Sequence, residues 1–387
     1  MSVKYVERKG TGCNKWDGMY AKFSSDDLLA MWIADMDFEL AEPIKNAMIK
    51  HIENVPLGYS IVPDEYLDNF INWEKTHHGY DVKREWICYS PGICAGFNLV
   101  LLMLTKPGDA VMTITPCYYP MQDAATVNDR KLVMCDLDKD GLTYTVNLER
   151  FEQSIVDNDV KLFIMSSPHN PVGRVWTKEE LTGMMDICKK HGVYVVSDEI
   201  HQDFVWEGYK HVPTATLGDY DDFLITMCSA SKSFNIAGLQ NSCIIIPSEE
   251  LRARYKDFQN RLHTTRGNIM GYVAAAAAFG QGDEWLNEVK EIIWGNYCYL
   301  KETFEKRAPK VKVAPLQATY LAWIDLGAYM KNQEEVVEFC EKKCRLAFDY
   351  GAWFGGDRFY NFVRMNLATS RSKVEEAVNA MLENLPL

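Results

Sequence analysis

The chain has 387 residues, of which 47% are hydrophobic and 25% are charged, and it carries a formal net charge of −13. This acidic balance argues against nucleic acid or an anionic membrane surface as a partner. The sequence has no apolar run of about 18 residues, so no transmembrane helix is expected. The N-terminus lacks the apolar core of a signal peptide, and a cytoplasmic protein is therefore expected.

The chain contains 11 cysteines, and most of them lie in apolar stretches. An odd number in a chain of this length is more typical of buried free thiols in a reducing compartment than of a disulfide framework. There is no C-x-x-C motif and no group of histidines and cysteines with zinc spacing. The sequence therefore predicts no metal site.

The first part of the chain is rich in turns and holds the segment M-W-I-A-D-M-D-F at residues 31–38. Pro43 is expected to open a helix that ends near His51. The segment 55–63 contains prolines and a glycine, which predict a loop, and a second helix is expected over 64–77. We expect His77 and its neighbour His78 to be solvated on that helix.

From residue 87 onward, apolar runs bounded by turn residues alternate with helical patterns. A strand at 87–90 leads into a helix over 91–104 that opens with P-G-I-C-A-G. Small residues at a helix start suit an anion, because the free N–H groups and the dipole point at it. Further strands are expected at 110–115, 131–135, 162–167, 193–197, 223–228 and 242–246, with a helix at 178–191. This alternation predicts an α/β fold with a mostly parallel sheet covered by helices on both faces.

In the last third of the chain, the sequence pattern first predicts helices and then a second alternation of strands and helices. The five alanines at 274–278 indicate close packing between helices. Helices are expected at 249–261, 271–279, 284–306, 333–348 and 373–382, and strands at 310–313, 320–326 and 362–367. We expect a large domain over residues 47–285 and a smaller α+β domain formed by residues 1–46 and 286–387.

Polar segments follow four of the predicted strands. They are P-C-Y-Y-P (116–120), S-S-P-H-N-P-V-G (166–173), S-D-E-I-H (197–201) and S-A-S-K (229–232). Ligands of an open α/β sheet bind beyond the carboxyl ends of its strands, so these segments are expected to meet in one crevice.

The residue types in these segments suit pyridoxal 5′-phosphate. Lys232 lies between apolar runs, where desolvation lowers the pKa of a lysine and favours a Schiff base, although an exposed loop lysine is the alternative. A carboxylate such as Asp198 can keep the pyridine nitrogen protonated, an amide such as Asn170 can donate to the phenolic oxygen, and an aromatic ring can stack on the cofactor.

The motifs N-P-V-G, S-D-E-I-H and S-A-S-K-S-F-N-I-A-G-L-Q resemble, in order and spacing, the cofactor motifs of the class I/II aminotransferases, which are fold-type I pyridoxal-phosphate enzymes. The resemblance extends over essentially the whole chain. It implies a large domain with a seven-stranded type of sheet between helices and a small domain built from both termini.

The resemblance also implies roles for individual residues. Lys232 corresponds to the Schiff-base lysine and a catalytic residue, together with Asp198 as the partner of the pyridine nitrogen. Arg364, in F-V-R-M-N-L-A, corresponds to the arginine that binds the substrate carboxylate. The further cofactor-binding residues implied are Ile93 and Cys94 through their backbone N–H groups, Tyr118 as the stacking ring with Tyr119 second, Asn170 and Ser229. Ser231 is also expected to bind the cofactor, and His201, three residues after Asp198, is expected either to line the site or to support the residues that do.

Tyr59, in L-G-Y-S, resembles the tyrosine that reaches the phosphate of a neighbouring subunit, which implies a homodimer with an active site shared across its interface. Tyr59 and Asp35 are also expected on the substrate side.

One residue differs from the common motif of the class I/II aminotransferases, and this difference indicates a particular branch of the family. The position eight residues after the lysine, usually an arginine, is Gln240 here. Together with M-W-I-A-D-M-D-F, this resembles the cystathionine β-lyase-like branch of C–S lyases (the MalY/PatB group). Gln317 and the segment 346–361 differ from many relatives, and both are expected on the substrate side.

The expected reaction is therefore a β-elimination from L-cystathionine, L-cysteine or another S-substituted cysteine, which releases a thiol, pyruvate and ammonia. An aminotransferase acting on an L-amino acid and a 2-oxo acid is the alternative on the same scaffold. A third hypothesis is that the chain is a non-catalytic protein that keeps the cofactor or binds another protein.

Overall fold

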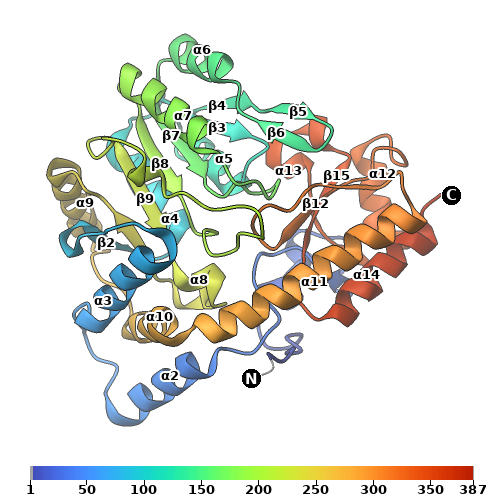
Figure 1. The fold of residues 1–387 in the computed structure, drawn as a ribbon, viewed down its shortest axis with the longest axis horizontal. Coiled ribbons are helices and arrows are strands. Elements are labelled where there is room, and N and C mark those ends of the chain that lie inside the picture. The colour runs from blue at the N-terminus through green and yellow to red at the C-terminus, as the bar shows by residue number, and fades with distance from the viewer. Residues whose placement is uncertain (1–2, 387) are drawn as a thin grey trace.

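The computed structural model describes residues 3–386. Its centre is a seven-stranded sheet in the order β2-β10-β9-β8-β7-β3-β4 (Figure 1). Only β10 runs antiparallel to its neighbours, so the predicted mostly parallel sheet is confirmed. The strands are β2 (Ile87–Ser90), β3 (Ala110–Thr115), β4 (Lys131–Asp136), β7 (Val160–Ser166), β8 (Tyr194–Asp198), β9 (Leu224–Cys228) and β10 (Ser242–Ile245).

Alternate side chains of the central strands enter two different cores. In β7, Leu162 and Ile164 pack with helices on one face, whereas Phe163 and Met165 pack with helices on the other. This is the two-residue period of a strand that is buried on both sides. The first face is covered by α4 (Ile93–Leu104), α5 (Tyr119–Thr126) and α9 (Glu249–Leu262), and the second by α6 (Leu148–Asn158) and α7 (Lys178–His191).

Helix α7 shows how local sequence sets the predicted boundaries. Thr177 and Glu180 form a capping box, in which each side chain accepts from the backbone N–H of the other residue. The helix ends where Gly192 takes a left-handed conformation with φ 66°. The predicted helix 178–191 is confirmed at both ends.

The alanines 274–278 are buried in α10 (Ile269–Gln281), which packs against α2 (Glu42–Asn54) and α3 (Asp64–Trp73). Small side chains allow these helices to approach closely, as the sequence predicted.

The second sheet is antiparallel, in the order β11-β12-β15-β14. Helices α11 (Asp283–Arg307) and α14 (Arg371–Asn384) lie side by side next to it, drawn orange and red in Figure 1. Its strands are β11 (Lys312–Val313), β12 (Leu321–Asp325), β14 (Asp349–Tyr350) and β15 (Phe362–Asn366). The predicted domain boundaries stay a prediction.

The predicted helix 333–348 is wrong in its second half. Helix α12 (Gln333–Val337) continues as a π-helical turn, η6 (Glu338–Lys343), and the chain then turns at Arg345, whose φ is 58°. The next residues form β13 (Leu346–Ala347), which pairs with β1 (Leu29–Ala30) near the N-terminus. A long-range pairing therefore overrides the helical pattern.

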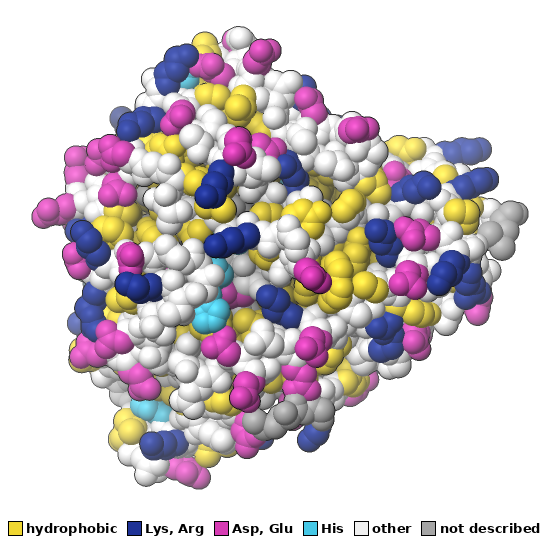
Figure 2. All heavy atoms as spheres, viewed as in Figure 1, with side chains coloured by type: hydrophobic (Ala, Val, Ile, Leu, Met, Phe, Trp, Pro, Cys, Tyr) yellow, Lys and Arg dark blue, Asp and Glu magenta, His cyan; other side chains and the backbone are white. Residues whose placement is uncertain are grey.

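The remaining elements are short. They are α1 (Asn14–Asp17), η1 (Met19–Ala21), η2 (Glu74–His78), η3 (Arg84–Trp86), the hairpin of β5 (Asp138–Asp140) and β6 (Thr143–Thr145), η4 (Thr214–Thr216), α8 (Ala230–Ser233), η5 (Ala237–Leu239), α13 (Ala352–Gly355) and η7 (Asp357–Phe359). Among residues 3–386, no helix is both long and apolar enough to cross a membrane. On the face shown in Figure 2, acidic and basic side chains are interspersed, and the basic ones form no continuous patch.

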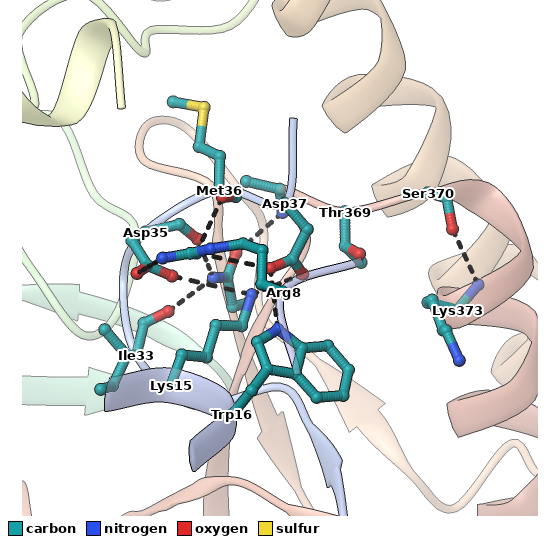
Figure 3. Close-up of polar contacts among 12 residues, drawn as sticks. Arg8, Lys15, Trp16, Ile33, Asp35, Met36, Asp37, Thr369, Ser370 and Lys373 are labelled. Carbon is teal, nitrogen blue, oxygen red and sulfur yellow. Dashed lines mark hydrogen bonds and ion pairs between the residues drawn. The ribbon is translucent and has the colours of Figure 1, made fainter. Parts of the chain in front are cut away.

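Buried charges anchor the N-terminal segment (Figure 3). The Lys15 ammonium lies 2.7 Å from the Asp37 carboxylate, and neither side chain is exposed. The Trp16 indole donates to the same carboxylate at 3.0 Å, and Arg8 pairs with Asp35 at 2.9 Å. These bonds fix the segment 31–38 against the rest of the chain.

Breaking this pair should destabilise the fold strongly. We expect Asp37→Ala to cost about 3–5 kcal/mol of unfolding free energy, because it leaves the buried Lys15 ammonium with only the more distant Asp35 carboxylate, 3.9 Å away, and removes the acceptor of the Trp16 indole. Asp27→Ala, which breaks the exposed pair with Lys9, is the matched control and should cost at most about 1 kcal/mol. Urea unfolding followed by fluorescence measures both. A loss for Asp37→Ala no larger than the control would contradict an anchoring role.

Candidate active site

A cavity of about 230 Å³ lies at the carboxyl ends of β7, β8 and β9. Eight of the predicted site residues line it: Ile93, Cys94, Tyr118, Asn170, Asp198, His201, Ser231 and Lys232. Ala34, Ser166, Gln240 and Asn241 are also in its wall. The four polar segments therefore meet in one crevice, as expected for an open α/β sheet.

Lys232 lies in the single turn of α8, which follows β9 directly. Ser229 caps this turn by accepting from the Ser231 N–H at 3.1 Å, and its own hydroxyl donates to the Asn241 carbonyl at 2.7 Å. The Lys232 ammonium is partly buried and donates to the Ala34 carbonyl at 2.6 Å. Burial lowers the pKa of Lys232, against the opposing charge of Asp35. A lysine of this kind can lose its proton and act as a nucleophile or base.

Asp198 ends β8 and is buried. Burial raises its pKa to about 7, although the Ile200 N–H donates to it at 3.1 Å and the Lys232 charge favours ionisation. Among residues 3–386, no basic side chain lies within ion-pair distance of the Asp198 carboxylate. A cationic N–H group in the cavity would stabilise the ionised carboxylate, and the protonated pyridine nitrogen of pyridoxal phosphate is such a group.

Arg364 projects from β15 and reaches the cavity through Asn170, to whose side-chain oxygen it donates at 2.9 Å. On its other side it pairs with the buried carboxylate of Asp349, its neighbour across β14 and β15. Burial raises the pKa of Asp349 to about 6, while the Arg364 charge lowers it. Sequence reasoning missed Asp349 because nothing local indicates this cross-strand pairing.

Two buried polar atoms in the cavity wall have no hydrogen-bond partner among the described residues. They are Nδ1 of His201 and Nδ2 of Asn241. Burial and the charges of Lys232 and Arg364 lower the pKa of His201 to about 3, so its ring is neutral. Unsatisfied buried polar atoms are costly, so this wall suits a polar ligand. Asn241 was not predicted, although it directly follows the A-G-L-Q motif.

The start of α4 offers an anion site at the same cavity. Gly92 precedes the helix with φ 103°, a conformation that favours glycine, and the N–H groups of Ile93 and Cys94 follow it. A Cβ atom on Gly92 would lie 3.5 Å from the side-chain oxygen of Gln240. The residue beside this helix start is thus a neutral amide, where the common pattern has a cation. These N–H groups, a buried carboxyl and a lysine fit the phosphate, ring nitrogen and carbonyl of pyridoxal phosphate.

Besides Arg364, three predicted residues do not line the cavity. Ser229 is occupied as the cap of α8, and its predicted phosphate contact stays a prediction. Asp35 follows the cavity residue Ala34, but one of its oxygens is bonded to Arg8, while the other is buried without a hydrogen bond. Tyr59 is fully exposed in the loop between α2 and α3. Within residues 3–386, no group of three or more His, Cys, Asp or Glu side chains is arranged to hold a metal ion.

The chain is similar over nearly its whole length to a known protein family, to curated relatives and to a solved structure. Residues 55–381 match the family model of aminotransferase class I and II. The sequence is 35% identical to cystathionine beta-lyase PatB of Bacillus subtilis over 97% of both chains, and 30% identical to protein MalY of Escherichia coli over 98% of this chain and 97% of the other. The crystal structure of cystalysin from Treponema denticola, which contains a pyridoxal 5′-phosphate cofactor, is similar with a TM-score of 0.95 and 32% identity over 99% of this chain and 98% of that one.

The buried Asp198 carboxyl should leave a pH signature in the protein without cofactor. Its folded pKa of about 7 is above the unfolded value of roughly 4, so the wild type loses stability as the pH rises through this window. Because asparagine cannot ionise, Asp198→Asn should gain about 2–4 kcal/mol relative to wild type between pH 4 and 7. Urea unfolding of the cofactor-free proteins across this range measures the difference. The exposed Asp81→Asn is the control, and a pH-independent difference for Asp198→Asn would argue against a buried titrating carboxyl.

Proposed function

The chain belongs to the aminotransferase class I and II family, and from that premise we propose that it is a pyridoxal 5′-phosphate-dependent carbon–sulfur β-lyase. The observation that carries the proposal is a partly buried lysine, Lys232, in one cavity with the buried, unpaired carboxyl of Asp198. The choice of a lyase is supported by relatives of matching length that are named cystathionine beta-lyase, at 35% identity for PatB. Its substrates are S-substituted cysteines such as L-cystathionine, and its products are a thiol, pyruvate and ammonia.

Pyridoxal phosphate, when bound, supplies a carbonyl carbon for the amino group and a protonated ring that withdraws electrons from the substrate Cα. Asp198 holds the proton on the ring nitrogen, because a cation beside it removes the cost of ionising this carboxyl. Asn170 binds the phenolic oxygen and Tyr118 stacks on the ring. The N–H groups of Ile93 and Cys94, with the Ser231 hydroxyl, would hold the phosphate. The Ser229 hydroxyl would join them by giving up its bond to the Asn241 carbonyl.

Arg364 binds the α-carboxylate of the substrate, since a planar guanidinium donates two parallel bonds to such a group. Its bonds to Asn170 and Asp349 fix its orientation, and its Nε has no hydrogen-bond partner within residues 3–386. Lys232 removes the Cα proton, for which a lowered pKa is suited near neutral pH. The Cβ–S bond then breaks and its electron pair leaves with the sulfur, which takes up a proton to give the thiol. The released enamine hydrolyses in water to pyruvate and ammonia.

We also propose a homodimer in which Tyr59 completes the phosphate site of the other copy. Helix α2 and the loop after it lie at the edge of the molecule (Figure 1). They expose a run of apolar side chains. These residues are Ile49, Ile52, Val55, Leu57, Tyr59 and Ile61. Exposed apolar patches of this kind mark interaction surfaces, and a second copy covering this one would bury them.

The first test is the release of pyruvate and free thiol from L-cystathionine by the purified holoenzyme, with no keto acid added. We expect stoichiometric release over many turnovers, and Lys232→Ala should lower the rate by at least about 10²–10⁴-fold. Conversion of the cofactor to the pyridoxamine form without thiol release would instead support the aminotransferase. If the protein shows neither thiol release nor conversion of the cofactor, a non-catalytic role would be supported.

Complementation between two variants tests the shared site. Lys232→Ala and Tyr59→Phe are each expected to be impaired, and mixed dimers can be isolated with two affinity tags. If Tyr59 acts across the interface, one site of a mixed dimer has both wild-type residues, so activity should rise to about half of wild type. Activity no higher than that of the Tyr59→Phe parent would show that Tyr59 acts within its own chain or not at all.

A further inference from the structure

A buried polar cluster adjoins Lys232 outside the cavity. Ser233, the next residue in α8, is fully buried, does not line the cavity and donates its hydroxyl to the carboxylate of Asp203. The same carboxylate accepts from the Trp73 indole at 3.1 Å and pairs with His78 at 2.8 Å. We call Trp73, His78, Asp203 and Ser233 the Asp203 cluster.

Within the Asp203 cluster, the neighbouring groups favour the charged form of Asp203. Burial opposes charge on both members, yet the bond and charge of His78 lower the pKa of Asp203 to about 2, and the bond to Asp203 raises the pKa of His78. The expectation that His78 is solvated is therefore wrong, because its side chain is 7% exposed and faces Asp203. Its neighbour His77 behaves as expected and pairs with the exposed side chain of Asp283 at 2.8 Å.

The π-helical turn η2, which follows α3 directly, places His78 in this position. A π-turn widens the helix by one residue per turn, and such turns occur often at functional sites. Here the turn directs His78 toward Asp203, while His77 stacks on the Trp73 ring with centroids 3.7 Å apart. The uncommon π-helical conformation of η2 thus places His78 beside the buried carboxylate of Asp203.

A buried ion pair is a weak source of stability, because desolvation of both charges offsets their attraction. Its position suggests a different purpose. Helix α8 has four residues, too few to be stable alone, so its placement depends on side chains at its two ends. One end is held by the Ser229 cap and the other by the bond from Ser233 to Asp203. Lys232 lies between these two anchors.

We propose that Asp203 and His78 are positioning residues that fix the direction of the Lys232 side chain by holding Ser233. This inference rests on the role of Lys232 in the proposed function. His78 keeps the Asp203 carboxylate ionised and oriented, and the carboxylate in turn holds the Ser233 hydroxyl. A displacement of about 1 Å at a reacting group can cost about 10²-fold in rate, so a loose α8 should impair proton transfer without weakening substrate binding.

The test compares holoenzyme variants with matched controls. Ser233→Ala removes only the link between α8 and Asp203, and its control is Ser242→Ala, a buried serine whose hydroxyl has no hydrogen-bond partner. His78→Gln is compared with Lys75→Gln, an exposed residue of the same turn. We expect Ser233→Ala and His78→Gln to lower kcat about 10–10²-fold with KM nearly unchanged, and both controls to resemble wild type.

A second readout separates this proposal from the proposed function. The visible absorbance and circular dichroism of the bound cofactor in the resting holoenzyme report the geometry at Lys232 whichever reaction the enzyme catalyses. We expect both bands to change in Ser233→Ala and His78→Gln and to stay constant in the controls. Unchanged bands and kcat, with only a lower Tm, would overturn the positioning role. If His78→Gln fails to fold, Ser233→Ala alone decides between these outcomes, because it leaves the ion pair intact.

Discussion

The site depends on keeping two groups of opposite charge, Asp198 and Lys232, in one partly desolvated cavity without pairing them. Within the described residues no ion pair joins them, and burial shifts the pKa of each toward its neutral form. The sheet achieves this separation by placing the groups at the ends of adjacent parallel strands, β8 and β9. A ligand that carries a cation at one end and an electrophilic carbon at the other can then satisfy both.

The N-terminal segment connects this cavity to the second sheet. The carbonyl of Ala34 accepts from Lys232 and also from the hydroxyl of Tyr320, which precedes β12. The backbone around Ala34 is held by the bonds of Asp35 and Asp37 to Arg8 and Lys15, so charged residues beside the cavity support one of its walls. The segment M-W-I-A-D-M-D-F therefore serves as structural support, and its apolar members pack in the core.

The local parts of this architecture could be predicted from sequence, because apolar runs and turn residues report strand ends directly. That sufficed for the sheet and for the meeting of Lys232, Asp198 and Asn170 in one crevice. Asp349 and His78 could not be predicted in the same way. Asp349 contacts Arg364 only because the two residues are paired across neighbouring strands. His78 faces Asp203 because of a π-turn that no local sequence pattern predicts. The helix expected over 333–348 failed for a related reason, since β13 pairs with a strand near the other end of the chain.

The neutral amide of Gln240 beside the start of α4 affects how an anion arrives. Dipoles act over much shorter distances than charges, and dissolved salt screens them little once they are in contact with a ligand. A chain with a net charge of −13 repels phosphate groups at long range, and no guanidinium at this position offsets that repulsion. Capture of the cofactor should therefore be slow, and its retention should rest on contacts that form only after docking. Slow exchange of the cofactor then follows from a low association rate as much as from high affinity.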